Sequence, residues 1–476
     1  MRALPAAEDL ALTHPSRTPA VFQSLLGELV TALDLPAAQA APLQVRGNDS
    51  LASCFPVSDL ATAAIGVAGL AAAELLAQGA PGLPVQVDRH LAAAWFKTSV
   101  RPLGWELPAV WDAITGDYRT RDGWLRLHAN ALHHRERALA VLGCANSHDA
   151  VAQAMAGGSG EALEAAIVAA GGCAAKLHTL AEWQAHPQGQ AVGAEPLIAQ
   201  EWTAADIASH WRPDPQRPLQ GIRVLDLTRI LAGPIATRLL AGLGAEMLRI
   251  DPPDWDEPAQ APEVTLGKRC ARLDLRRPAD RRVFEALLGD ADVLVHGYRA
   301  DALERLGYGS AERRALNPAL IDVSLCAYGW TGPWALRRGY DSLVQMSCGI
   351  AAAGRDWQNG EQPVPLPVQA LDHATGYLMA AAVIRGLTGR LREGRILSAR
   401  LSLARTACLL TGHPAVACEP LYAGVQDADY DTASEPTAWG PALRLRPPLR
   451  IGDLRLHWQR PATRLGSASA AWSTAG

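Results

Sequence analysis

The sequence lacks the features that mark nucleic-acid-binding, disulfide-rich and metal-binding proteins. Its 44 basic and 48 acidic residues leave a net charge of only −4, which argues against a nucleic-acid partner or a polybasic membrane surface. The eight cysteines are scattered without a Cys-x-x-Cys pair, and the histidines do not cluster at metal-ligand spacing. We therefore expect no metal site, no disulfide framework, and reduced thiols in a cytoplasmic protein.

Long hydrophobic runs are also scarce, and the N-terminus lacks a charged segment followed by an apolar one. The longest apolar run, residues 60–73, stops at Glu74 and is too short to span a bilayer. It predicts a buried helix, and we expect no membrane partner. At 476 residues, the chain is long enough for two or three domains with sizeable cores.

Residues 221–276 are the most informative stretch, because they have the pattern of strand, tight turn, helix and second strand, followed by a basic loop and a strand. The apolar run 222–227 has the composition of a buried parallel strand. The turn Ala232-Gly233-Pro234 then opens a helix over 235–243, and residues 245–251 predict the next strand. This is the start of a mononucleotide-binding α/β fold, in which helix N-termini attract phosphate. A dinucleotide site is disfavoured, since no G-x-G-x-x-G follows the first strand.

The amino-acid sequence of this stretch and of the motifs after it resembles that of one protein family. The segments GIRVLDLTRILAGPIATRLLAGLGAEMLRIDPP, GKRC with LDLR, ADVLVHGYR, LERLG, LNP, YGWTGP and GYD follow one another between residues 221 and 341. In identity and order they resemble the family III CoA-transferases, the formyl-CoA transferase and carnitine CoA-transferase group. The resemblance implies an α/β fold with a six-stranded Rossmann-like large domain and a smaller α+β domain. It also implies an interlocked homodimer.

A weak internal repeat suggests how the domains are ordered along the chain. Residues 58–63 align with 371–376, and each segment is followed by an Ala-rich helix, a Gly-containing turn and a strand-like segment. Residues 116–125 resemble the start of the family's small domain, although they follow the first repeat and not the second. The proline-rich residues 213–218 are the predicted linker. We therefore expect a degenerate partial copy of the large domain at 1–110, the small domain at 115–205, and a CoA-binding Rossmann-like domain with a C-terminal return segment at 218–476.

The resemblance also implies a catalytic nucleophile. Family members form an aspartyl-CoA thioester on an aspartate at the head of a helix, within a pattern like ADxxTG. Asp372 matches this pattern in Leu371-Asp372-His373-Ala374-Thr375-Gly376. A helix start favours an ionised carboxylate through the helix dipole, although aspartate is also a common N-cap. Asp59 has the same place in the first repeat but lacks the following glycine, and we expect it to be a structural cap.

The family's CoA-binding positions fall on residues whose chemistry suits the parts of CoA. Basic residues at loop ends suit the pyrophosphate and the ribose phosphate, and apolar residues suit adenine. The matching positions are Leu231, Ala232, Leu273, Arg276, Gly297, Tyr298, Arg299, Arg305, Arg338 and Tyr340. Pro252 stands where the family has a basic residue, which puts one phosphate contact in doubt. The resemblance implies no covalently bound cofactor at rest; coenzyme A and acyl-CoA are substrates.

The histidines are expected to have structural roles. His128, His133 and His134 fall on a predicted surface strand and helix of the small domain, where solvated or satisfied side chains are the default. His373 is adjacent to the predicted nucleophile, where it could tune the carboxylate or serve packing. No histidine is therefore assigned to catalysis.

The predicted function is transfer of CoA between an acyl-CoA thioester and a free carboxylic acid. Two alternatives stay open. Acyl-CoA racemases of the same fold use a histidine base within a GHD pattern, where this chain has Gly339-Tyr340-Asp341. A phenol with a pKa near 10 is a poor base at neutral pH, so Tyr340 argues against racemisation. The second alternative is a non-catalytic CoA-binding relative, suggested by the degenerate repeat and the rearranged small domain.

Overall fold

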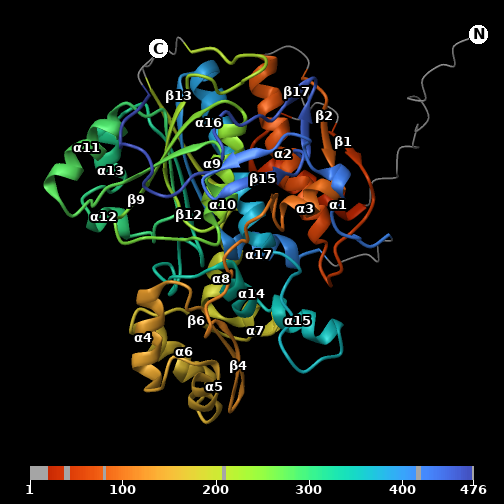
Figure 1. Ribbon diagram of the computed structural model, residues 1–476, viewed down its shortest axis with the longest axis vertical. Coiled ribbons are helices and arrows are strands. Elements are labelled where there is room, and N and C mark those ends of the chain that lie inside the picture. Colours follow the sequence, from red (N-terminus) through yellow and green to blue (C-terminus); the bar gives the residue numbers. More distant parts are fainter. Residues whose placement is uncertain (1–19, 37–42, 79–81, 206–210, 414–419, 474–476) are drawn as a thin grey trace, which may run out of the picture.

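The computed structural model describes residues 20–36, 43–78, 82–205, 211–413 and 420–473. A large α/β body carries a smaller unit, which contains helices α4–α6, below it in Figure 1. The described chain therefore has the expected class, an α/β large domain with a smaller α+β unit.

A seven-stranded sheet forms the centre of the large body. Six strands are parallel in the order β10-β9-β8-β11-β12-β13, and β7 adds to the edge as an antiparallel strand. In chain order the parallel strands run 3-2-1-4-5-6, so the direction of winding reverses between β8 and β11. The six expected strands are present, and β7 is an addition. The seven strands are β7 (Ala199–Ala204), β8 (Arg223–Leu227), β9 (Glu246–Asp251), β10 (Lys268–Arg272), β11 (Val293–His296), β12 (Ile321–Cys326) and β13 (Arg395–Ser402).

Helices cover both faces of this sheet, because alternate side chains of each buried strand point to opposite cores. On β8, Val224 belongs to the core beneath α9 and α16, whereas Leu225 packs with Phe284 of α11 on the other face. The predicted strand, turn, helix and strand over 222–251 are confirmed as β8, α9 and β9. The helices of the large domain are α9 (Ala232–Gly242), α10 (Ala261–Val264), α11 (Pro278–Gly289), α12 (Ala302–Arg305), α13 (Ser310–Leu316), α16 (Ala370–Glu393) and α17 (Leu403–Thr411).

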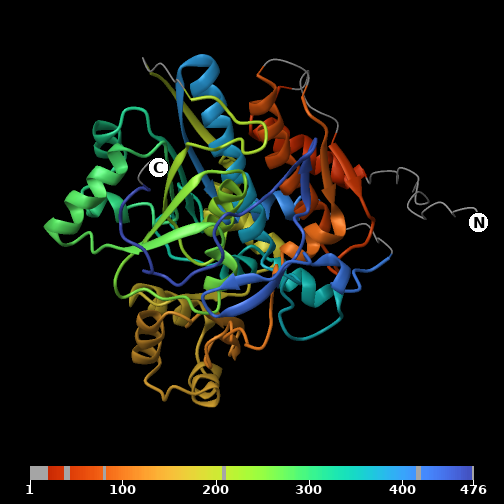
Figure 2. The same ribbon diagram turned by 45° about the horizontal axis from the view of Figure 1, so that its top comes forward.

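The N-terminal and C-terminal segments build a second sheet together. Parallel strands β1 (Leu43–Arg46) and β2 (Val85–Asp88) are joined by α2 (Val57–Ala77), and β2 also pairs antiparallel with β16 (Leu449–Ile451). Helix α2 lies beside α16, as Figures 1 and 2 both show. The remaining elements of this region are α1 (Ala20–Ala32), α3 (Arg89–Trp95), β3 (Val100–Pro102), β14 (Glu435–Thr437), β15 (Gly440–Arg444) and β17 (Leu454–Arg455), with β3 paired to β15.

Helix α2 is a core helix of the protein. Its 21 residues are long and apolar enough to cross a membrane, but 89% of its most apolar window is buried inside the structure. The apolar run 60–73 therefore forms a buried helix, as predicted, and the helix extends beyond the run at both ends.

Helices α2 and α16 begin with the same backbone turn. Pro56 before α2 has φ −76° and ψ 61°, and Gln369 before α16 has φ −75° and ψ 65°, the values of an inverse γ-turn. Each helix leads to a strand, β2 or β13, that has one parallel and one antiparallel neighbour. These likenesses agree with a repeated unit, whose common origin stays a prediction.

The smaller unit has its own sheet and core, and it ends earlier than the predicted boundary at residue 205. Helix α8 packs on α17, and β7 pairs with β13 in the main sheet, so residues after about 180 belong to the large body. The physical reason is that β7 satisfies the backbone groups of β13, which would otherwise form an exposed edge. The unit contains β4 (Gly116–Thr120), β5 (Gly123–Leu127), β6 (Ala174–Lys176), α4 (Leu132–Leu142), α5 (His148–Ala156) and α6 (Gly160–Ala169).

Four further helices lie between the smaller unit and the large body. Helix α14 packs against β6, and α15 contacts α7. The predicted linker 213–218 contains neither helix nor strand, but it lies between β7 and β8 of the main sheet and therefore does not separate two domains. The seven cysteines within the described ranges are all free. The connecting helices are α7 (Leu180–Ala185), α8 (Pro187–Ala194), α14 (Asp341–Ser347) and α15 (Ile350–Trp357).

Candidate active site

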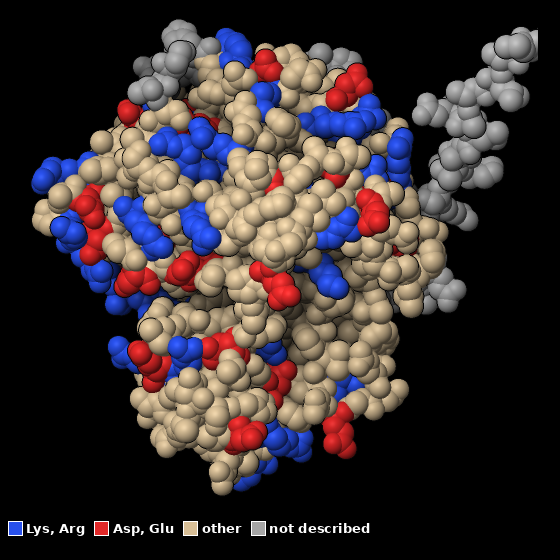
Figure 3. All heavy atoms as spheres, viewed as in Figure 1, with Lys and Arg blue, Asp and Glu red and all other residues tan. Residues whose placement is uncertain are grey.

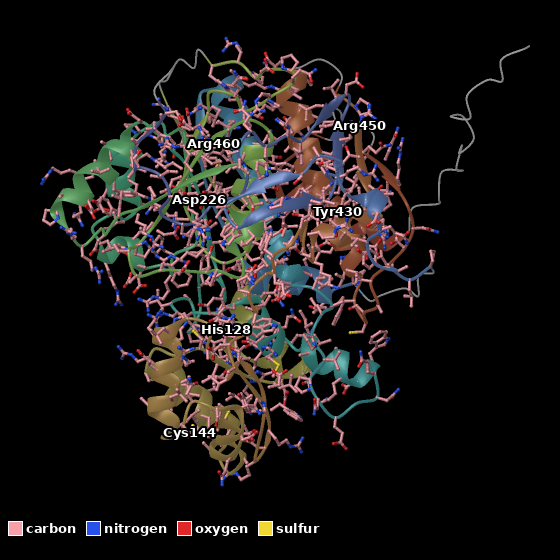
Figure 4. All side chains as sticks on the ribbon, in the orientation of Figure 1. His128, Cys144, Asp226, Tyr430, Arg450 and Arg460 are labelled. Carbon is pink, nitrogen blue, oxygen red and sulfur yellow. The ribbon has the colours of Figure 1, made fainter. Side chains whose placement is uncertain are left out.

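Two cavities meet between the small unit and the carboxyl ends of the central strands. The first, of about 340 Å³, is lined by Arg229, Arg299, Arg337 and Arg338 among others, and we call it the arginine cavity. The second, of about 250 Å³, includes Val110, Trp111 and Leu231, and we call it the side cavity. Figure 3 shows the surface hollowed in this region, and His128, which lines the side cavity, is labelled in Figure 4. Ligands of doubly wound sheets bind where the strand order reverses, which is the position of the arginine cavity. The two cavities share Ile230, Trp255, Tyr340 and Asp372.

Asp372 lies at the junction of the two cavities. It is the third residue of α16, is 8% exposed, and its carboxylate accepts a hydrogen bond from the backbone N–H of Ala232 at the start of α9. Gly376, one turn along α16, permits this approach, because a Cβ there would lie 2.4 Å from the Ala232 carbonyl oxygen. Both Asp372 and its counterpart Asp59 lie within the helix, so neither is an N-cap.

A second carboxyl group lies beside Asp372. The backbone N–H of Asp372 donates to Oδ2 of Asp341 at 2.9 Å. Burial and the neighbouring Asp341 raise the pKa of Asp372 well above its usual range, while burial raises the pKa of Asp341 to about 6. The expectation that the helix dipole keeps Asp372 ionised is therefore wrong. Burial and the neighbouring negative charge raise the pKa of Asp372 more than the helix dipole lowers it. The two carboxyls titrate as a pair.

The arginine cavity carries positive charge with few local counter-ions. No described carboxylate lies within 4.0 Å of Arg229 or Arg338, whereas Arg299 pairs with Asp301 at 3.0 Å and Arg337 with Glu164 at 2.7 Å. The Arg229 guanidinium lies over the rings of Trp255 and Tyr298, 4.7 and 5.0 Å from their centroids. Two guanidinium groups free of carboxylates suit the phosphates of a nucleotide.

The backbone between β8 and α9 is strained at the point where it lines both cavities. Ile230 has φ 66°, a left-handed conformation that is rare for a β-branched residue. Its N–H donates to Glu257 Oε2 at 2.8 Å, and Glu257 is held by the buried Arg249 at 2.6 Å. Such strain persists where the surroundings fix it, and it is common at ligand sites.

The small unit contributes histidines to the site, and the predicted surface placement is wrong for two of the three. His128 is buried and stacks on Tyr340 with 3.8 Å between centroids, and His134 is buried 3.4 Å from the Tyr340 hydroxyl. Burial lowers the pKa of both imidazoles to about 3, so they are neutral. His133 is exposed and lines the arginine cavity. Nothing local in the sequence indicates this placement, because it depends on how the small unit docks.

Of the two roles considered for His373, tuning of the Asp372 carboxylate and packing, the structure favours packing. Its ring stacks on Phe96, 4.9 Å between centroids, and it lines neither cavity. Among the described residues, no group of three or more His, Cys, Asp or Glu could hold a metal ion.

The cavities bring together most, but not all, of the predicted CoA-binding residues. Leu273 is buried in the core, and Arg276 and Arg305 have side chains 69% exposed and paired with Asp274 and Asp301. These three line neither cavity, and sequence reasoning missed Arg229, Ile230 and Trp255, which do. The predicted residues that line the cavities are Leu231, Ala232, Gly297, Tyr298, Arg299, Arg338 and Tyr340.

Comparison with known proteins agrees with this geometry. The model of CoA-transferase family III matches residues 219–438. This region is a CoA-transferase family III domain. It contains Asp372, the start of α9 and most of both cavities.

The domain's relatives include named CoA-transferases. The acetyl-coenzyme A transferase nodX of Hypoxylon pulicicidum is 33% identical over 232 residues, 46% of this chain and 39% of that protein. The succinyl-CoA:glutarate CoA-transferase of Mus musculus is 32% identical over 211 residues, 41% of this chain and 48% of that protein. A crystal structure of the D175A mutant of Rv3272 from Mycobacterium tuberculosis has a TM-score of 0.38 at 31% identity, covering 42% of this chain and 57% of that one. The chain spans about half the length of the curated relatives it matches.

Proposed function

We propose that this protein transfers CoA between an acyl-CoA thioester and a free carboxylic acid, with Asp372 as the nucleophile. One observation carries the proposal. Asp372 is buried at the junction of two cavities, with a backbone N–H on its carboxylate and no described cation within 4.0 Å of it. A poorly solvated carboxylate aimed at a cavity is what attack on a thioester requires. The family III domain supports the same assignment.

In the proposed reaction, a carboxylate oxygen of Asp372 attacks the thioester carbonyl carbon. The carbon–sulfur bond breaks, the CoA thiolate leaves, and a mixed anhydride forms. The thiolate then attacks the carbonyl carbon of Asp372, which releases the acyl group as a free carboxylate and leaves an aspartyl-CoA thioester. A second carboxylate reverses these steps and leaves as the new acyl-CoA. The Ala232 N–H can stabilise the oxyanion that forms on Asp372.

The neighbouring groups have distinct roles in this scheme. Asp341 accepts hydrogen bonds from the Gln345 amide and the Asp372 backbone, and its charge raises the pKa of Asp372 and so its basicity as a nucleophile. Arg229, Arg299 and Arg338 bind the phosphates of CoA in the arginine cavity. Leu231, Ala232, Gly297, Tyr298 and Tyr340 line its path to Asp372. Binding of the CoA nucleotide by Leu273, Arg276 and Arg305, outside the cavities, stays a prediction.

The two alternatives receive less support from the site. Racemisation needs a base, and burial raises the pKa of Tyr340 above that of an ordinary phenol. The neutral His128 and His134 have lowered pKa values, which makes them weak bases. A purely CoA-binding role does not explain a buried carboxyl pair that opens onto the cavity.

Intact mass spectrometry after incubation with a panel of acyl-CoAs tests the proposal. We expect a CoA-sized adduct on wild-type protein, mapped to the peptide that contains Asp372 and released by hydroxylamine. Asp372→Asn should give no adduct while retaining CoA affinity by calorimetry. Binding of CoA with no adduct from any donor would favour the non-catalytic alternative. Homodimer formation and a cytoplasmic location stay predictions, and sedimentation analysis tests the first.

A further inference from the structure

The side cavity is lined by carboxylates and contains no lysine or arginine among its lining residues. Two of its carboxylates are already paired, Asp112 with Arg135 and Glu257 with Arg249. Asp256 is exposed, and Asp341 lies beside Asp372, whose backbone N–H donates to it at 2.9 Å. A ligand that enters this cavity therefore meets negative charge and no free cation.

The rest of the wall combines polar side chains (His128, Asn130, Gln260, Ser342 and Gln369) with apolar and aromatic ones. It includes Val110 and Trp111 from the segment before β4, and Leu231, Trp255 and Pro258 from the large domain. An apolar cavity of about 150 Å³ is enough to hold benzene. The side cavity, at about 250 Å³, has room for an acyl group larger than a phenyl ring.

One arginine lies close by, but it is neutralised. The Arg126 guanidinium lies over the Trp111 ring, 5.3 Å from its centroid, and donates to both carboxylate oxygens of Asp117 at 2.9 and 2.8 Å. Arg126 does not line the cavity. It is therefore not available to a second carboxylate on a substrate.

We propose that the acids used by this protein are monocarboxylic, with an uncharged apolar acyl group of at least aromatic-ring size, and that dicarboxylic acids are rejected. The inference rests on the proposed function, because it assigns the acyl group to the side cavity and CoA to the arginine cavity. The reacting carboxyl sits at Asp372, and the rest of the acyl group extends past Trp111. A second carboxylate there would lie close to Asp341 with no lysine or arginine in the cavity wall to pair with it, which a protein site disfavours.

Two acyl-CoAs of opposite character test this inference on the full chain. The initial rate of adduct formation is measured by quenched mass spectrometry with phenylacetyl-CoA and with succinyl-CoA. We expect phenylacetyl-CoA to react at least about 100-fold faster, the scale of discrimination when a buried polar group is left unpaired. Equal rates, or a preference for succinyl-CoA, would overturn the inference.

A charge placed on the cavity wall should shift the preference. Trp111→Arg should lower the ratio of the two rates by about 10-fold or more, mainly by raising the succinyl-CoA rate, since an interfacial ion pair sets specificity. Trp357 is 49% exposed and lines neither cavity, so Trp357→Arg is the matched control and should leave the ratio within about 2-fold. A ratio that Trp111→Arg leaves unchanged would place the acyl group elsewhere.

Binding to an inactive variant separates this inference from the proposed function. Calorimetry of free phenylacetate and free succinate with CoA-saturated Asp372→Asn needs no turnover. Tighter binding of phenylacetate supports the side cavity as the acyl site even if no adduct forms, and in that case only the catalytic role of Asp372 fails. Tighter binding of succinate overturns the inference whatever the adduct experiments show.

Discussion

Asp59 and Asp372 occupy the same place in two long apolar helices, yet their surroundings are opposite. Each is the third residue of its helix after the same backbone turn, and they are 5% and 8% exposed. Asp59 accepts a hydrogen bond at 2.7 Å from Arg89, the first residue of α3. The first residue of α17, the helix that follows α16 and β13 as α3 follows α2 and β2, is Leu403, which lines the arginine cavity together with Asp372. In the proposed mechanism, the difference is that Asp59 is paired with an arginine, whereas Asp372 has no cationic partner among the described residues and is therefore free to act as a nucleophile.

The largest expected difference is between the two aspartates themselves. Asp372→Asn should abolish the CoA adduct and leave stability nearly unchanged. Asp59→Asn should retain the adduct but lower the free energy of unfolding by about 3–5 kcal/mol, because Arg89 is left buried without its partner. Intact mass and urea unfolding measure the two effects. If Asp59→Asn is inactive although folded, while Asp372→Asn is active, the assignment between the helices is reversed.

An arginine introduced beside Asp372 should give it surroundings like those of Asp59. Leu403→Arg should pair with Asp372 and reduce the rate of adduct formation at saturating acyl-CoA by about 100-fold, equivalent to about 2.7 kcal/mol. Leu403→Met keeps the volume and adds no charge, so it should remain close to wild type. Full activity in Leu403→Arg would show that the absence of a cation is not what matters.

The residue one turn after the aspartate is a second difference between the two helices. Gly376→Ala should lower stability by about 1–3 kcal/mol and also the adduct rate, because the new Cβ pushes the Ala232 carbonyl away from α16. The corresponding residue of α2 is Ala63, and Ala63→Gly should lower stability by only about 0.5–1 kcal/mol. Thermal unfolding of the two variants, with adduct rates, provides the comparison. An unimpaired Gly376→Ala would mean that α9 need not approach α16 closely.

The arginines allow the same comparison for CoA binding. Arg338→Ala should weaken CoA binding by about 1–3 kcal/mol, the range for a charge-assisted hydrogen bond. Arg276 is solvent-exposed and bound to Asp274, so Arg276→Ala should change affinity less, although the sequence predicts equal importance. Calorimetry with CoA measures both. A larger loss in Arg276→Ala would place the nucleotide outside the arginine cavity.

The smallest expected effect is a shift in pH dependence. The reaction needs ionised Asp372, so its rate should fall as pH falls through the raised pKa of that group. Asp341→Asn removes a like charge, lowers this pKa, and should move the acid limb of the pH–rate profile to lower pH. The wild-type pair binds protons more tightly when folded, so its stability should decline as pH rises from about 4 through about 6 and above, and Asp341→Asn should reduce that decline. An unmoved acid limb would separate Asp341 from the nucleophile.

Local patterns in the sequence were enough to predict the elements around the site. The apolar run 222–227, the Ala-Gly-Pro turn and Gly244 define β8, α9 and the helix end without reference to distant residues. The order of the motifs, which resembles that of the family, then identified Asp372 as the predicted nucleophile. What could not be predicted depends on contacts between distant segments. Arg89 beside Asp59, Asp341 beside Asp372, and His128 against Tyr340 follow from how whole elements dock, and no spacing encodes them.

The pairing of β2 with β16 has a consequence for biosynthesis. Val87 pairs with Leu449, so the second sheet is incomplete until β16, about 360 residues after β2, has left the ribosome. At about 5–20 residues per second, roughly 20–70 s separate the emergence of these two strands. During that time β2 has one open edge, and an unpaired strand edge invites pairing with other chains. Nascent chains stalled before β16 should therefore aggregate or recruit chaperones through the open edge of β2, although this strand is synthesised long before β16.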